Sequence, residues 1–153
     1  MTNPIDAAKA RMLSGPTLRP WDVVPAVVEL QELLRAHGFR VPTTGEFGSQ
    51  TEDAVKIFQV RHGLRADAIV GPKTWAVLKH SVQPGSRTLR LGWSGVDVYE
   101  LQGLLLVNGY SLPRDGLFTE ATQAAVRDFQ ATHKLRETGM VDRVTWSLLS
   151  NKR

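Results

Sequence analysis

The sequence contains no cysteine among its 153 residues, so neither disulfide bonds nor thiolate metal ligands can stabilise a small core. It also lacks any apolar run close to the roughly 20 residues that a membrane-spanning helix needs. The N-terminal stretch MTNPIDAAKARMLSG has no apolar segment of the kind that marks a secretory signal peptide. We therefore expect no membrane insertion and synthesis in the cytoplasm, with any action at the cell wall following lysis or a specialised export route.

A concentrated charge of one sign is missing as well. The formal net charge of +4 suggests an anionic partner, with nucleic acid as one possibility. However, residues 1–80 carry ten basic and eight acidic side chains, and residues 81–153 carry nine and seven, with the signs interleaved. This even distribution argues against nucleic acid as the partner.

What the sequence does contain is a long internal repeat. The stretch AVKIFQVRHGL at residues 54–64 returns as AVRDFQATHKL at residues 125–135. Residues 17–79 align without a gap with residues 88–150, and 25 of the 63 aligned pairs are identical. So many matches in the same order indicate a duplicated unit. The intervening stretch SVQPGSR has the composition of a linker.

The apolar spacing within each copy predicts three helices. The first is expected over about residues 23–37, because Val27, Leu30 and Leu34 share one helical face. A capping box at Ser49 is expected to start the second helix, and Gly71-Pro72 the third. In the second copy Thr119 and Asp142 are the expected caps. The stretches 69–71 and 140–142 are predicted to add a short extended pairing.

We therefore predict an all-α fold of two tandem three-helix units joined by a short linker. The expected bounds are an N-terminal arm at residues 1–16, a first repeat at 17–80, a linker at 81–87 and a second repeat at 88–153. In the arm, Ile5, Ala8 and Met12 share one helical face, but Gly15-Pro16 stops that pattern. We expect the arm to be frayed or loosely docked.

The residues that carry chemistry do not form a catalytic or metal-binding pattern. None of the four histidines has HExxH or HxH spacing, and no G-x-S-x-G stretch is present. Glu29 and Glu100 are equivalent acids beside the core face of the first helix, where a helix-surface contact is expected. His62 and His133 suit contacts with the last carbonyls of the second helix. The sequence predicts no enzyme, no metal site and no cofactor.

The recurring aromatic and amide residues are interpreted mainly as structural. Core spacing is found for Trp75, Trp146, Phe58 and Phe129, whereas Phe47 and Phe118 precede the second helix and are expected to be half exposed. Four glutamines recur beside core positions, namely Gln31, Gln59, Gln102 and Gln130. A buried amide needs backbone partners, which we expect in the turns at Gly45 and Gly116.

The assembled pattern resembles the peptidoglycan-binding domain, a small three-helix module attached to many bacterial and phage cell-wall hydrolases. The leader L-R-x-G appears at residues 89–92, and the D-G-x-F-G motif appears as Asp115-Gly116-Leu117-Phe118 and as Thr44-Gly45-Glu46-Phe47-Gly48. The closing D-G-x-V-G-P-x-T-W motif appears at residues 67–75 and in part at residues 139–146. The resemblance covers about residues 17–150 and implies a three-helix fold for each copy.

The sequence departs from the family pattern mainly at turns and caps. Thr44 replaces the usual aspartate, Ala68 replaces a glycine, and Asp142-Arg143 replaces Gly-Pro. These changes leave the fold in place and bear on ligand affinity. No catalytic domain accompanies the two copies in this sequence.

The resemblance implies non-catalytic attachment to the glycan strand and stem peptide of peptidoglycan. Two linked sites on a repeating polymer would act as a bivalent targeting or anchoring subunit, and a separately encoded wall hydrolase or particle protein is an expected partner. The candidate ligand contacts are Arg40, Gly45, Phe47, Trp93, Asp115, Gly116 and Phe118. Trp21 and Trp93 precede the first helices, where a packing role is favoured over an exposed sugar platform.

Three other functions stay open at this point. A structural adaptor could use the same fold to bind a protein partner, for example in a phage-tail-like or injection particle, and the altered turns favour it. A nucleic-acid binder rests only on the net charge, and a wall hydrolase would need a catalytic cluster.

Overall fold

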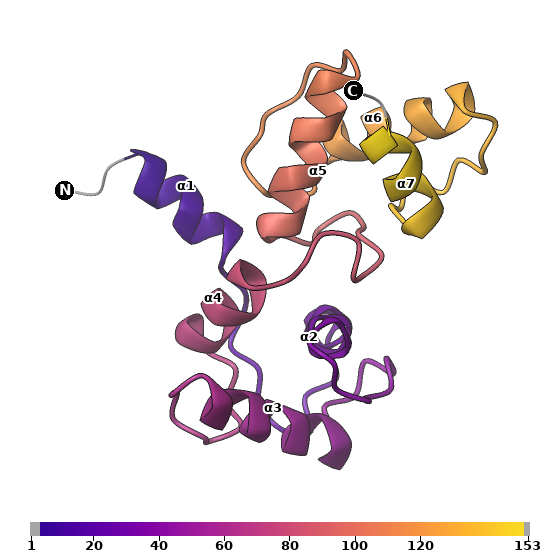
Figure 1. Ribbon diagram of the computed structural model, residues 1–153. Helices are drawn as coiled ribbons and strands as arrows, with labels where there is room; N and C mark the ends of the chain where they lie inside the picture. The colour runs from indigo at the N-terminus through magenta and orange to yellow at the C-terminus, as the bar shows by residue number, and fades with distance from the viewer. Residues whose placement is uncertain (1–3, 152–153) are drawn as a thin grey trace. The chain divides into compact units, whose positions relative to one another are not determined.

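The computed structural model describes residues 4–151, and within them the chain forms seven α-helices and no strand (Figure 1). The helices are α1 (Pro4–Met12), α2 (Pro25–Ala36), α3 (Ser49–Arg61), α4 (Pro72–His80), α5 (Val96–Val107), α6 (Glu120–Thr132) and α7 (Arg143–Asn151). The prediction of an all-α fold with three helices per repeat is confirmed. Over the described range, no helix has the length and apolar character of a membrane span.

The chain divides into two compact units. The first unit comprises residues 13–82 with α2, α3 and α4. The second unit comprises the residues from 83 onward with α5, α6 and α7, and it also includes α1. The expected N-terminal arm is therefore shared between the units. Its first part is a helix whose Met12 is 9% exposed, so the expectation of a frayed arm is wrong for this segment.

Each unit has its own apolar core, built from the predicted helix faces. In the first unit α2 packs against α3 and α4, and in the second α5 packs against α6 and α7. The buried aromatic residues of the two cores are Phe47, Phe58 and Trp75 in the first and Phe118, Phe129 and Trp146 in the second. Burial of apolar surface at these equivalent positions stabilises each unit.

Short extended pairings close each unit around its helices. Leu18 pairs with Val70, and the equivalent Leu89 pairs with Val141, each through two backbone hydrogen bonds of 2.8–3.1 Å. This confirms the predicted extended pairing at the third helix. A second pair of bridges joins Val23 to Glu46 and Ser94 to Leu117, so the segment before the first helix lies along the first turn.

The helix starts follow the predicted caps in two of three cases. Thr119 Oγ1 accepts from the Thr122 amide, and Asp142 Oδ1 accepts from the Thr145 amide at 2.9 Å, which confirms both caps. The capping box at Ser49 is wrong, because Ser49 is already helical and Gly48 is the N-cap. Its side chain is therefore one position too late to accept from the first turn.

Four buried glutamines clamp the turns that join the helices. Gln31 Oε1 accepts from the Gly45 amide at 2.9 Å, and its Nε2 donates to Glu46 O at 3.0 Å and to Thr51 Oγ1 at 3.1 Å. Gln102 makes the same three contacts with Gly116, Leu117 and Thr122. The prediction that amides from α2 and α5 hold these turns is confirmed.

The glutamines of α3 and α6 hold a different turn from the one expected. Gln59 contacts Ala68, Ile69 and Thr74, and Gln130 contacts Gly139, Met140 and Thr145. Each amide therefore ties its helix to the following turn and to the next helix. The four clamps repeat one arrangement of donors and acceptors.

Two buried ion pairs, one in each unit, were not predicted. In the first unit Lys79 Nζ lies 3.3 Å from Glu29 Oε2, with side chains 2% and 7% exposed. Glu29 is therefore buried in this pair, and the expected helix-surface contact is wrong for it. In the second unit Arg87 Nε lies 2.8 Å from Asp97 Oδ2, and both side chains are fully buried.

We expect Gln31→Leu to destabilise the first unit by about 2–4 kcal/mol, because it leaves a buried amide, a carbonyl and a hydroxyl without partners. Thermal and urea unfolding followed by circular dichroism would measure the loss. The control Gln50→Leu changes an exposed glutamine of α3 and should leave stability within about 0.5 kcal/mol. Equal effects of the two substitutions would contradict the clamp.

Candidate functional site

The turns predicted to contact ligand are held rigidly by side chains of their own unit. Gly45 and Gly116 have φ of +82° and +76°, a left-handed conformation that glycine adopts readily. Asp115 Oδ1 accepts from the Leu117 amide at 3.0 Å, and Thr44 Oγ1 accepts from the Glu46 amide at 3.1 Å. Thr44 thus supplies the same turn contact as aspartate, so this departure from the family pattern preserves the turn.

Phe47 and Phe118 lie in the cores. They are 0% and 2% exposed, so the expectation of half-exposed rings is wrong. Each ring follows directly after a clamped turn, and that turn directs it inward beneath the start of the next helix. Their backbones, in contrast, bond the segment before the first helix, since Phe47 O accepts from the Trp21 amide at 2.7 Å.

The two tryptophans that precede the first helices have opposite environments. Trp93 is 7% exposed, and the guanidinium carbons of Arg87 and Arg90 lie 5.2 and 4.4 Å from its ring centroid. This is the packing role that the sequence favoured. Trp21 is 74% exposed, so for this residue the favoured packing role is wrong.

Trp21 is held in place although its side chain is exposed. Its amide donates to Phe47 O, and the Phe47 amide donates to Asp22 O at 3.0 Å. Its φ of +76° is left-handed, which is unfavourable for a residue with a bulky side chain. Val23 and Val24 beside it are 68% and 43% exposed. Trp21, Val23 and Val24, named here the Trp21 surface, are therefore three exposed apolar residues in the segment that pairs with the Gly45 turn.

Arg40 is exposed beyond the end of α2, in the segment that leads to the Gly45 turn. In the second unit the equivalent position is Ser111, and the position equivalent to Trp21 is Gly92. The aromatic face and the candidate cation are therefore features of the first unit.

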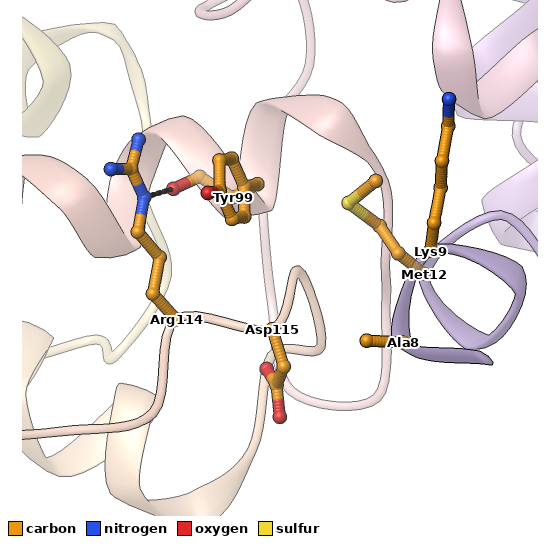
Figure 2. Close-up of a pocket in the computed structure, with 6 residues that line it drawn as sticks. All are labelled: Ala8, Lys9, Met12, Tyr99, Arg114 and Asp115. Atoms are coloured by element: carbon orange, nitrogen blue, oxygen red, sulfur yellow. Dashed lines mark hydrogen bonds between the residues drawn. The ribbon is translucent and has the colours of Figure 1, made fainter. Parts of the chain in front are cut away.

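In the second unit a pocket of about 340 Å³ lies beside Asp115 (Figure 2). It is lined by Ala8, Lys9 and Met12 of α1, Tyr99 of α5, and Arg114 and Asp115 of the turn. Met12 packs directly on Gly116, where a Cβ atom would overlap its side chain. Sequence reasoning missed this contribution of α1, because α1 lies outside the repeat and the alignment of the two copies gives it no partner.

Arg114 and Tyr99 form one wall of this pocket. Arg114 Nε donates to Tyr99 O at 3.1 Å, and its guanidinium carbon lies 4.0 Å from the Tyr99 ring centroid. Figure 2 shows the guanidinium turned toward Tyr99 while Lys9 extends away from Asp115. The pocket lining thus combines apolar side chains with two cations and one carboxylate.

The histidines and other titratable groups serve the scaffold. His133 Nδ1 lies 2.9 Å from Phe129 O, which confirms the predicted contact with a helix-end carbonyl. The His62 ring lies 4.2 Å from the Phe58 ring, centroid to centroid.

Burial and the hydrogen bond to Asp128 raise the pKa of Tyr110 to about 12. Within residues 4–151 no three His, Asp or Glu side chains gather as a potential metal site.

The fold is therefore a tandem pair of small three-helix modules with clamped turns. A family model described as "Putative peptidoglycan binding domain" matches this chain twice, at residues 24–78 and 94–149. The chain belongs to this family and carries two copies of its domain.

Two curated proteins and one solved structure are similar to parts of this chain. The N-acetylmuramoyl-L-alanine amidase CwlM of Mycobacterium tuberculosis is 34% identical over 147 residues, covering 85% of this chain and 36% of CwlM. Protein FadG of Bacillus subtilis is 28% identical over 122 residues, covering 75% of this chain and 20% of FadG. The crystal structure of Burkholderia AP3 phage endolysin is 46% identical over 44% of this chain and 26% of that chain, with a TM-score of 0.42. The chain thus spans about a third or less of each relative.

We expect Trp21 to dominate quenching of the tryptophan fluorescence by acrylamide, because the other three indoles are at most 7% exposed. Trp21→Phe should remove most of the quenchable emission, whereas Trp93→Phe should leave the quenching constant of the remaining emission unchanged or higher. Steady-state fluorescence with added acrylamide measures both. Strong quenching that survives Trp21→Phe would place the accessible indole elsewhere.

Proposed function

We propose that this chain binds peptidoglycan without cleaving it and acts as a bivalent targeting or anchoring module. Membership of the family supports the polymer as ligand. The observation that carries the proposal is the exposed Trp21, whose amide donates to Phe47 O beside the Gly45 turn. A flat indole face suits stacking on a sugar ring, and the adjacent turn offers polar groups for the hydroxyl or peptide groups of the polymer.

The polar side chains of the clamped turns support a non-catalytic role. Asp115 Oδ1 accepts from both the Leu117 amide and Gln102 Nε2, the latter at 3.3 Å. Thr44 occupies the equivalent place in the first unit and cannot supply a carboxylate. General acid–base cleavage of a glycan needs two carboxylates facing one cleft, and the repeated turn is not built around such a pair.

The second unit is proposed to contribute its own, different surface. The lining of the Asp115 pocket includes the cations Lys9 and Arg114 as well as Met12 and Tyr99. Such a lining suits a stem peptide, which presents carboxylates and methyl groups. Two weak and unlike sites on one chain gain affinity together when the polymer carries both ligands.

The test of wall binding is retention on purified insoluble peptidoglycan at physiological salt. We expect Trp21→Ala to weaken retention roughly tenfold, about 1.4 kcal/mol, and Trp21→Phe to weaken it less. Val144→Ala, another exposed apolar residue, is the matched control. A wild-type protein that stays in the supernatant would refute wall binding and favour the adaptor function. Retention that modest salt abolishes would indicate only generic charge attraction.

Bivalency is tested by combining Trp21→Ala with Lys9→Glu, a charge reversal at an exposed position of the Asp115 pocket. If both units engage the polymer, each single variant should retain part of the avidity and the double variant should fall to background. Binding isotherms on the insoluble polymer measure this. If Lys9→Glu has no effect alone or in combination, the first unit binds by itself.

A further inference from the structure

The indole of Trp75 in the first unit is covered by groups of the chain itself. Trp75 Nε1 donates to Pro16 O at 2.7 Å. Lys79 Nζ lies 2.6 Å from Ser14 O and 4.8 Å from the Trp75 ring centroid, and it pairs with Glu29 at 3.3 Å. The backbone of Gly15 lies against the ring, since a Cβ there would come within 2.5 Å of an indole carbon. The indole therefore has an acceptor, a peptide backbone and an ammonium as its partners.

The equivalent place in the second unit is an open pocket. It has a volume of about 420 Å³ and is lined by residues of α5, α7 and the loop before α5: Pro84, Gly85, Glu100, Leu104, Trp146, Ser147, Ser150 and Asn151. At the offset of 71 residues these match Leu13, Ser14, Glu29, Leu33, Trp75, Ala76, Lys79 and His80 of the first unit. The carboxylate and the indole are kept, whereas the lysine is replaced by Ser150.

The groups left in this pocket lack the partners that their equivalents have. Trp146 is 7% exposed, and its Nε1 is buried without a hydrogen-bond acceptor in the structure. Glu100 is exposed and pairs with no cation among residues 4–151. A buried donor without an acceptor is unfavourable by about 1–3 kcal/mol, so the site favours a molecule that supplies one.

The loop before α5 explains why the chain does not fill the pocket itself. Arg87 stands where the first unit has Pro16, and its guanidinium is held by Asp97 through two hydrogen bonds of 2.8 and 2.9 Å. Ser86 donates its amide to Gln83 O at 3.1 Å, which closes a turn at this point. The loop is therefore fixed by contacts that the first unit does not have, and no carbonyl reaches the Trp146 indole.

We propose that this pocket binds a primary alkylammonium group with a neighbouring carbonyl, the chemistry of a lysyl residue. The ammonium takes the place of the Lys79 ammonium, between the Glu100 carboxylate and the face of Trp146. The carbonyl takes the place of Pro16 O and accepts from Trp146 Nε1. Because Glu100 is exposed, binding is weak, with a Kd on the order of millimolar. The site is separate from the Trp21 surface and does not depend on the proposed wall binding.

The direct test is a titration of the full chain with N-acetyl-L-lysine methylamide, followed through the Trp146 indole N–H signal by NMR. Trp146→Phe assigns that signal among the four indoles. We expect a saturable downfield shift as the indole gains its acceptor. N-acetyl-L-norleucine methylamide has the same aliphatic stem without the ammonium and should bind at least tenfold more weakly. Equal shifts with both compounds would overturn the proposal.

Two variants connect the binding to the residues. Ser150→Lys restores the lysine of the first unit, so it should abolish the shift and raise the midpoint of thermal unfolding, which also shows that the variant folds. Glu100→Gln should weaken lysine binding at least fivefold, whereas Glu137→Gln, an exposed acid elsewhere in the unit, should leave it unchanged. Undiminished binding by Ser150→Lys or by Glu100→Gln would refute the site.

A further experiment distinguishes the two sources of such an ammonium. One source is a peptide amine of the wall, and the other is a lysyl side chain of a protein. Acetylation of the amines of insoluble peptidoglycan should lower retention of the wild-type chain but not of Glu100→Gln if the wall is the source. An equal effect on both chains would exclude the wall amine as the ligand of this site. If the chain does not bind the wall at all, the titration with N-acetyl-L-lysine methylamide still tests the site, because it uses no wall material.

Discussion

The fold depends on one interaction used four times, a buried glutamine amide that clamps a turn between two helices. In each case Oε1 accepts from the amide of a residue with positive φ, over 2.7–3.1 Å, and Nε2 donates to the carbonyl of the following residue and to a threonine. The clamp replaces water for several buried polar groups at once. Because each amide contacts two helices and the turn between them, it fixes both the packing of the apolar faces and the position of the turn.

Much of this could be predicted from the sequence, because it depends on local signals that occur twice. Helical spacing, the turn glycines and the pairing of Gln31 and Gln102 with the Gly45 and Gly116 turns were all predicted from the repeat. The partners of Gln59 and Gln130 were assigned to the wrong turn, because a repeat fixes equivalence between copies and leaves the contacts within a copy undetermined. The burial of Phe47 was not predicted for another reason. Phe47 lies in a turn, where helical spacing gives no indication of which side chains face the core.

The features that matter most for function lie where the copies differ, and the repeat does not highlight those positions. Lys79 with Glu29 and Arg87 with Asp97 are each found in one unit alone. Each removes a charged pair from solvent, and its loss would leave an uncompensated buried charge. Lys79 also fills the space that stays open beside Trp146. Lys79 and the backbone of residues 14–16 together cover the Trp75 indole, and neither has a counterpart beside Trp146.

Trp21 shows how such a difference bears on binding. In the second unit the equivalent position is Gly92, with φ of +91°, where a left-handed conformation carries little strain. Trp21 adopts φ of +76° with a bulky side chain, a strain on the order of 1–3 kcal/mol. Its indole is 74% exposed, so packing within the unit offsets little of that strain. A contact outside the chain would offset that strain, and the proposed stacking of a sugar ring on the indole is such a contact.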